Sequence, residues 1–251
     1  MDSSLKKLDM LKELVTELES DAFFPKYVQE LFLSELRLAK IRSEQQKILD
    51  QYKNSSDLLI NIGAGDQGKP DWVNLDVFSC LGVNCIYDCR KSLPFPNNSV
   101  KGIFCEHFLE HMDYEEEAPR FLSECYRVLK RNGVIRLIVP DIEMYLHAYC
   151  ERGWEKISTI RGIDSEHTDL YYKSGHPYKF NYKTKAELIN FVFRQKYQHK
   201  YGYDYETLEN LLYESGFSQV QKQGFCRSLM PELCIDRDIR ASESLYVEGI
   251  K

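Results

Sequence analysis

The chain has 251 residues, of which 43% are hydrophobic, and a formal net charge of −6 at pH 7. This length and apolar content are enough for one α/β domain with a complete core, whereas an acidic balance disfavours a nucleic-acid partner, which usually meets a basic face. No apolar run approaches the length of a membrane span, and the N-terminus has no unbroken apolar core, so neither membrane association nor a signal peptide is expected.

Two helices are predicted ahead of the first strand. Residues 5–18 carry leucine and valine at three- and four-residue spacing, which is typical of an amphipathic helix. After a break at 21–25, a second helix is expected from about Lys26 to Tyr52. We treat residues 1–56 as a helical extension that packs against the sheet; a lid over a cofactor and a contact between copies of the chain are the alternatives.

A glycine-rich turn follows the first predicted strand. Leu58–Ile62 is a short apolar run of the kind that forms a buried strand. The three glycines of a G-x-G-x-x-G pattern come next, at Gly63, Gly65 and Gly68. Glycine allows a sharp turn and a close approach of the backbone to a ligand. A second strand ends on Asp76, where a carboxylate can hold both hydroxyls of a ribose.

The connection between these two strands restricts the ligand. Only about ten residues, 63–72, separate them, and Pro70 interrupts the connection. A dinucleotide site needs a full helix after the glycines and an acid roughly 20 residues further on. A pyrophosphate also needs a helix N-terminus to bind. The sequence therefore favours a nucleoside without phosphates and disfavours an NAD-linked oxidoreductase.

Three further strands and a helix are predicted before residue 142. The third strand ends at Asp88, and the fourth covers Val100–Glu106. A helix at 120–130 is expected to end at Asn132-Gly133. The fifth strand, 134–139, is almost wholly apolar, which is typical of a central parallel strand.

The remainder contains an insert and two last strands. Residues 142–203 are expected to hold helices at 142–150 and 185–197, with an aromatic stretch between them that suits an acceptor pocket or a structural cap. A helix at 205–215 follows. The last two strands are predicted at 217–224 and 245–250.

The motifs in this order resemble one family. The succession NIGAGD, LD, YDCRKSLPFPNNSV, FCEHFLEH and RFLSECYRVLKRNGVIRLIVPD, over about residues 57–141, resembles the class I S-adenosylmethionine-dependent methyltransferases, in particular their type 11-like branch. The resemblance implies a Rossmann-like α/β fold with a seven-stranded, mostly parallel sheet and an antiparallel last hairpin. It assigns residues 57–251 to the methyltransferase domain, with 142–203 as the insert on the acceptor side.

The resemblance also implies an activity. S-adenosylmethionine would be the cofactor, and the acceptor would be an oxygen of a small molecule or of a sugar or glycan precursor, since members often act in surface-glycan or secondary-metabolite pathways. An N-methyltransferase and a nucleoside-binding protein of the same fold without methyl transfer are the alternatives. A homo-oligomer through the N-terminal helices and a cytoplasmic location complete these expectations.

Specific residues follow from the resemblance. Asp76 would hold the ribose, Asp88 the adenine amine with the Cys89 N–H nearby, and Glu106 would face the methionine part. Asn61 stands where the family usually has an acid, so that Asp66 is a candidate to replace the missing charge. The full cofactor-binding set is Asn61, Gly63, Ala64, Gly65, Asp66, Asp76, Val77, Asp88, Cys89 and Glu106.

Histidines are the candidates for proton transfer. His107 and His111 are four residues apart, on one face if a helix starts there. Histidine titrates near neutral pH, so it can take a proton from an acceptor hydroxyl. We expect His111 to be the base and His107 to position it, with His176 as a second candidate; helix capping or packing is the structural alternative for each. No metal is expected, because the H-E-x-x-H order is absent and none of the eight cysteines forms a C-x-x-C pair.

Overall fold

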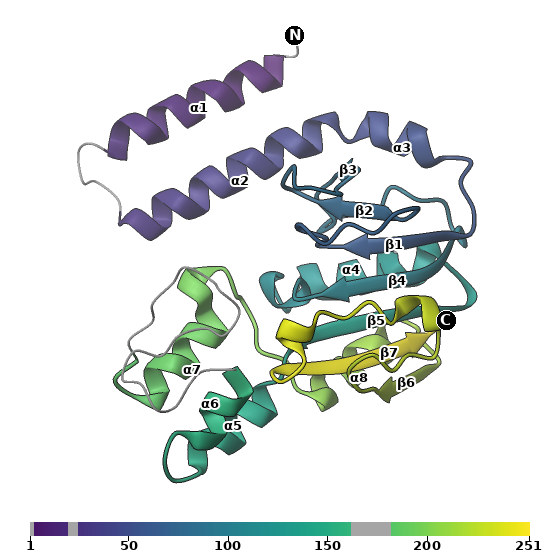
Figure 1. Ribbon diagram of the computed structural model, residues 1–251. Helices are drawn as coiled ribbons and strands as arrows, with labels where there is room; N and C mark the ends of the chain where they lie inside the picture. Colours follow the sequence, from purple (N-terminus) through teal and green to yellow (C-terminus); the bar gives the residue numbers. More distant parts are fainter. Residues whose placement is uncertain (1–2, 20–24, 162–181) are drawn as a thin grey trace.

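The computed structural model describes residues 3–19, 25–161 and 182–251 (Figure 1). Within these ranges, seven strands form one sheet in the order β3-β2-β1-β4-β5-β7-β6. The strands are β1 (Leu58–Ile62), β2 (Val73–Asp76), β3 (Cys85–Ile86), β4 (Val100–Glu106), β5 (Leu129–Pro140), β6 (Gln219–Lys222) and β7 (Ser244–Ile250). The first five strands pair in parallel, and β7 is antiparallel to both of its neighbours. The predicted mostly parallel sheet and its antiparallel last hairpin are confirmed.

The helices follow the predicted order, except that α6 (Glu155–Arg161) was not expected and that two of the predicted helices are shorter or divided. The α-helices are α1 (Ser3–Glu19), α2 (Lys26–Glu44), α3 (Gln46–Tyr52), α4 (Glu117–Val128), α5 (Ile142–Cys150), α6 (Glu155–Arg161), α7 (Lys185–Arg194) and α8 (Tyr205–Glu214). Short 3-10 turns are η1 (Leu109–His111), η2 (Gln195–Tyr197), η3 (Pro231–Leu233) and η4 (Asp238–Arg240). The second predicted helix is divided at Gln45 into α2 and α3, and the helix expected to reach Tyr197 ends at Arg194, where left-handed backbone begins.

The prediction that Asn132-Gly133 ends a helix is wrong. Helix α4 ends at Val128, and β5 begins at Leu129, which pairs with Val100. The register of β5 against β4 then shifts, and Asn132 takes a positive φ of 63°. The Asn-Gly pair therefore forms an irregular point within a strand rather than a helix end.

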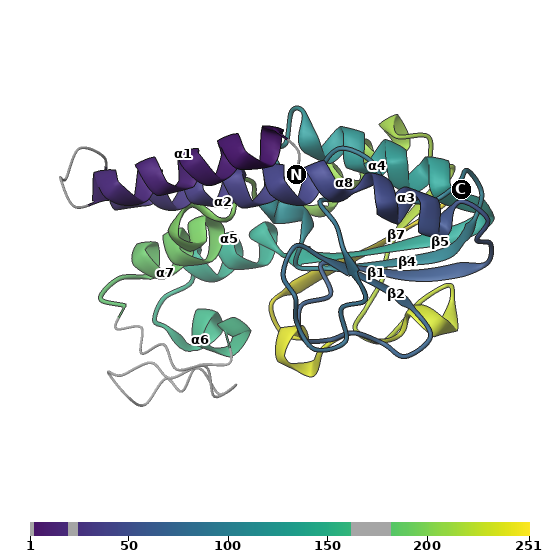
Figure 2. The same cartoon turned by 90° about the horizontal axis from the view of Figure 1, so that it is seen from above.

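Successive side chains of the central strands point to opposite faces of the sheet, as the pleat requires. A different set of elements packs on each face. On one face, helices α3, α4 and α8 lie above the sheet (Figure 2). The side chains of β5 that join this larger core include Ile135, Leu137 and Val139. On the opposite face, Val134 and Ile138 of β5 pack with Phe104 and Tyr246 and with Leu233 of η3.

The segment between β6 and β7 covers that second face and is fixed by one buried arginine. Arg136 of β5 donates to Asp236 through Nε at 2.8 Å and to Glu248 of β7 at 3.0 Å. It also donates to the carbonyl oxygens of Arg227 and Gly224, at 2.7 and 2.9 Å. All three charged side chains are fully buried. A single guanidinium therefore holds the covering segment at three residues and joins it to β7 through Glu248.

The N-terminal helices lie beside the sheet rather than within it. Helix α1 packs along α2, and α2 continues into α3 above the β1–β3 end of the sheet (Figures 1 and 2). Met10 and Leu14 of α1 are 62% and 53% exposed, and Leu31 and Phe32 of α2 are also exposed. Contact between copies of the chain through these helices stays a prediction. No helix in the described ranges is long and apolar enough to cross a bilayer.

The third glycine of the motif has a packing role. A Cβ added to Gly68 would lie 2.3 Å from the carbonyl oxygen of Gly82, so the two backbones meet in direct contact. We expect Gly68→Ala to lower the free energy of unfolding by about 1–3 kcal/mol, the usual range for overpacking. Urea denaturation would measure it. The matched control is Gly224→Ala, whose added Cβ would meet only Arg227 Cδ at 3.6 Å; an equal effect of both substitutions would contradict the packing role.

Candidate active site

The glycine loop lies at the carboxyl end of β1, the edge at which open α/β sheets bind ligands. Gly63 and Gly65 take positive φ values of 71° and 51°. The N–H groups of Gly63 and Ala64 donate to Leu75 O, each at 3.0 Å, which joins the loop to β2. A Cβ added to Gly65 would meet nothing within 4 Å. The loop therefore presents open backbone at its second glycine.

Asp76 fixes the same loop from the end of β2. Its Oδ2 accepts from Gly65 N at 2.8 Å, and its Oδ1 accepts from Phe78 N at 2.9 Å. Asp76 is only partly buried, so it is accessible to a further donor. This position is compatible with the expected ribose contact, which stays a prediction, as does the role of the neighbouring Val77.

Asn61 and Asp66 are arranged around Gln67. Asn61 is buried in β1, and its Nδ2 donates to Gln67 O at 3.2 Å. Asp66 is exposed, and its Oδ1 accepts from Gln67 Nε2 at 3.0 Å. The Asn61 amide therefore stabilises the conformation of the loop. Asp66, a carboxylate, lies nearer to solvent.

Asp88 is held by two arginines. Arg42 of α2 donates to Oδ2 at 2.6 Å, and Arg90 donates to Oδ1 and Oδ2, each at 3.0 Å. Burial works to raise the pKa of Asp88, but the two guanidinium groups outweigh it and lower the pKa. The adjacent Cys89 is buried. The sequence motif did not indicate that Asp88 would be the anchor of the N-terminal extension.

Helix α2 is tied to the core along its length. Glu35 accepts from Arg90 Nη1 at 2.7 Å, and Tyr27 stacks on Tyr197 of η2 with ring centroids 4.6 Å apart. Arg37 lies over the ring of Phe78, 4.6 Å from its centroid. These contacts run from the residues after β2 and β3 to the acceptor-side insert, so α2 bridges the two regions expected to bind cofactor and acceptor.

Glu106 ends β4 with its carboxylate in contact with Arg237. Arg237 N donates to Oε1 at 3.1 Å, and the guanidinium Nε donates to Oε2. Glu106 is 5% exposed. The expected contact with the methionine part of the cofactor stays a prediction, and the segment before β7 also reaches this position.

The histidines after β4 do not share one helical face. His107 takes a positive φ of 51°, and the 3-10 turn η1 begins only at Leu109. His107 Nε2 lies 2.8 Å from Ser244 Oγ, and its Nδ1 lies 3.3 Å from Glu110 Oε1. Both ring nitrogens are thus in polar contacts, which suits a positioning residue better than a proton acceptor.

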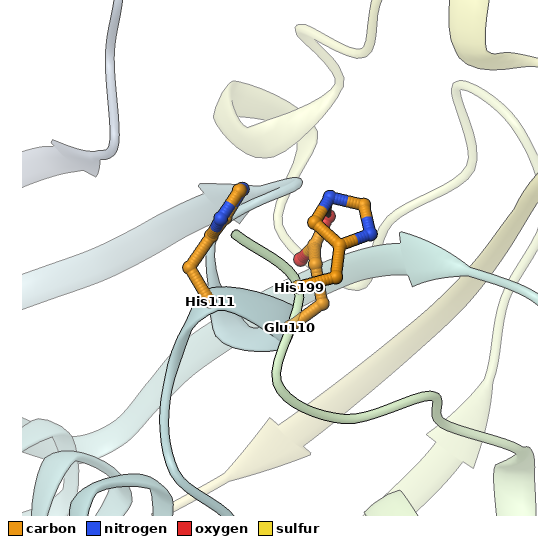
Figure 3. A group of neighbouring side chains, drawn as sticks. All are labelled: Glu110, His111 and His199. Atoms are coloured by element: carbon orange, nitrogen blue, oxygen red, sulfur yellow. Dashed lines mark ion pairs between the residues drawn. The ribbon is translucent and has the colours of Figure 1, made fainter. Parts of the chain in front are cut away.

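His111 lies beside a histidine that sequence reasoning missed. His111 Nδ1 is 3.1 Å from Gln198 O, and its ring meets that of His199 edge-on with centroids 4.7 Å apart. The buried Glu110 lies between the two imidazoles in Figure 3. His199 follows η2, 88 residues after His111, and no motif spacing connects them. His176, the second candidate base, lies outside the described residues.

The electrostatics of this group are set by burial. Burial would raise the pKa of Glu110, but the nearby His107, His111 and His199 outweigh it and lower the pKa to about 2. Burial lowers the pKa of His199 to about 4, although the negative charge of Glu110 acts to raise it. At neutral pH, Glu110 is therefore an anion and His199 is neutral.

Part of the sequence matches a known family. Residues 81–137, from just before β3 into β5, match the family model described as "Methyltransferase domain". This part of the chain is therefore similar to methyltransferase domains. No curated protein matches the chain.

Several solved structures are similar to this chain. An S-adenosylmethionine-dependent methyltransferase from Archaeoglobus fulgidus has 19% identity and a TM-score of 0.45, over 88% of this chain and 99% of that one. A possible histamine N-methyltransferase from Thermotoga maritima has 18% identity and a TM-score of 0.43, over 97% and 99%. Phosphoethanolamine N-methyltransferase 2 from Haemonchus contortus, in complex with S-adenosyl-L-methionine, has 11% identity and a TM-score of 0.41, over 83% and 52%.

The match over residues 81–137 agrees with the expected methyltransferase family, for which S-adenosylmethionine is the expected cofactor. The glycine loop and Asp76 fit that cofactor. The backbone at Gly65 is open, and it lies beside the partly exposed carboxylate of Asp76. Gly63, Gly65 and Asp76 are the residues that would hold the cofactor.

Proposed function

We propose that this methyltransferase O-methylates a small molecule or a sugar or glycan precursor, with His111 receiving the proton of the acceptor hydroxyl. The supporting observation is the orientation of one ring. A carbonyl oxygen can only accept a hydrogen bond, so His111 Nδ1 must carry the ring hydrogen that it donates to Gln198 O. The lone pair of Nε2 is then available to accept a proton.

The chemistry needs such a group. Bound S-adenosylmethionine supplies a methyl group to the acceptor oxygen, and its carbon–sulfur bond breaks with the electron pair left on sulfur. The hydroxyl proton has to leave before or during this transfer, because a neutral alcohol is a weak nucleophile. Nε2 of His111 can take that proton, and the Glu110 carboxylate lies beside the ring.

Screening would test the acceptor class. The purified chain and labelled S-adenosylmethionine would be incubated with sugar nucleotides and small phenols in one arm and with primary and secondary amines in the other. We expect methyl ethers as products. Methylation of amines alone would contradict the oxygen acceptor. Binding of S-adenosylhomocysteine without turnover in either arm would favour a nucleoside-binding protein of the same fold.

Asp76 offers a test of cofactor binding. We expect Asp76→Ala to weaken binding of S-adenosylhomocysteine by about 1.5–3 kcal/mol, because charge-assisted hydrogen bonds are lost. Calorimetric titration would measure it, with Asp50→Ala on the exposed face of α3 as the control and with NAD as a second titrant. Unchanged affinity in the Asp76 variant would show that the ribose lies elsewhere.

A further inference from the structure

Glu110, His111 and His199 bring three possible metal ligands together. One oxygen or nitrogen from each lies within 4.8 Å of the others (Figure 3). The backbone holds the two contributing segments in place, because Lys200 N and Tyr201 N both donate to Glu110 O, at 2.7 and 3.3 Å. The three side chains therefore converge on a point fixed by main-chain hydrogen bonds.

Both imidazoles are held through the same ring nitrogen. His199 Nδ1 lies 2.7 Å from Val192 O, and His111 Nδ1 lies 3.1 Å from Gln198 O. Each Nδ1 therefore carries the ring hydrogen, and each Nε2 keeps a lone pair in the neutral ring. A hydrogen bond from the second ring nitrogen to a backbone carbonyl is the usual support of a metal-binding histidine.

The carboxylate between the rings lacks hydrogen-bond donors. Glu110 is 1% exposed, and neither of its oxygens accepts a hydrogen bond from any residue that the structure describes. His107 Nδ1, at 3.3 Å, is at ion-pair distance without hydrogen-bond geometry. His199 Nε2 lies 4.0 Å from Oε1, so an imidazole lone pair and a carboxylate oxygen face each other with no hydrogen between them. A cation between these atoms would satisfy both.

We propose that Glu110, His111 and His199 bind one divalent transition-metal ion, Zn²⁺ foremost, through a carboxylate oxygen and two imidazole Nε2 atoms. Two nitrogens and one oxygen suit Zn²⁺ and its neighbours, whereas Mg²⁺ and Ca²⁺ prefer oxygen alone. Bound ligand atoms lie about 2 Å from zinc, so small side-chain rotations would draw the three together. Three protein ligands leave a fourth position for water or another oxygen.

This inference goes beyond the proposed function, since it concerns binding of the ion and not the acceptor. It constrains that function in one way. His111 Nε2 cannot hold a metal ion and receive a proton at the same time, so the metal content of the protein has to be fixed before its activity is interpreted.

Cobalt offers a direct readout that does not need activity. The full chain would be stripped with a chelator and titrated with Co²⁺, followed by visible absorbance, and then with Zn²⁺ in competition. We expect one equivalent to bind per chain, with visible cobalt bands and no thiolate-to-cobalt band in the near ultraviolet. His199→Gln and Glu110→Gln should each weaken binding at least about tenfold, the lower end of the effect of removing even a supporting group.

The control is the exposed pair of His147 and Glu143, which lie one helical turn apart in α5 with 3.7 Å between Nε2 and Oε1. His147→Gln should bind Co²⁺ like the unchanged chain. Circular dichroism would confirm folding of each variant, and His111→Gln supplies a less buried third substitution. Equal binding by the ligand variants and the control, a thiolate band, or no binding to the stripped chain would overturn the proposal. Titration with S-adenosylhomocysteine reports separately on the proposed function.

Discussion

His111→Ala is expected to lower kcat at least about a hundredfold while leaving the affinity for S-adenosylhomocysteine unchanged, since removal of a general base usually lowers the rate about 10²–10⁴-fold. The affinity should hold because His111 is not among the residues expected to bind the cofactor. It comes from η1, beyond the end of β4, and its polar contact is with Gln198 O. The measurement is single-turnover methyl transfer by chelator-treated protein, together with calorimetry.

The choice of control makes this result specific. His147→Ala removes an exposed histidine of α5 and should leave both quantities unchanged. Raising the pH should partly restore turnover in the His111 variant if the missing step is deprotonation, because hydroxide and the ionised acceptor then replace the base. Near-full kcat in the variant would assign the role to His176 or to water, or would indicate an amine acceptor that is already neutral.

Glu243→Gln is expected to lower the free energy of unfolding at pH 7 by about 3–5 kcal/mol, the usual effect of breaking a buried ion pair. Glu243 is 3% exposed and joins three elements. Its Oε2 accepts from Tyr145 of α5 at 2.8 Å and from Arg161 of α6, and its Oε1 accepts from Arg240 of η4 at 2.6 Å. The amide cannot balance the charge of the buried Arg161. Urea denaturation would measure the effect.

The pH dependence of this effect has a definite sign. Burial would raise the pKa of Glu243, but the charges of Arg161 and Arg240 lower it to about 2, whereas the unfolded chain has an ordinary value near 4.3. The stabilisation is therefore fully present above the unfolded pKa and is lost as the pH falls toward 2. The two proteins should differ less at pH 3 than at pH 7. A constant difference, or an equal loss in the exposed control Glu143→Gln, would contradict this account.

The strands could be predicted because the relevant signals are local. The short apolar runs at β1 and β4 and the glycines after β1 identify the central sheet without long-range information. The Asn-Gly pair misled the prediction because the same dipeptide suits any point with positive φ, whether at a helix end or within an irregular strand such as β5.

The polar contacts of the site could not be predicted, because they join residues far apart in the sequence. Arg42 reaches Asp88 across 46 positions, and Arg237 reaches Glu106 across 131. His199 lies in a segment whose sequence shows no motif, so its approach to Glu110 depends on how the insert folds back along the carboxyl edge of the sheet. A single sequence gives the types of these side chains but not their distances.

The covering of the second face by the segment after β6 has a consequence for synthesis. As a nascent chain leaves the ribosome, β1, β4 and β5 appear long before Leu233, and the apolar face around Phe104 and Ile138 stays bare in the interval. The edge of β5 is also unpaired until β7 is made, because β7 lies between β5 and β6. The native sheet is complete only after β7 has been made, so a nascent chain that ends near Lys222 exposes both this apolar face and the edge of β5.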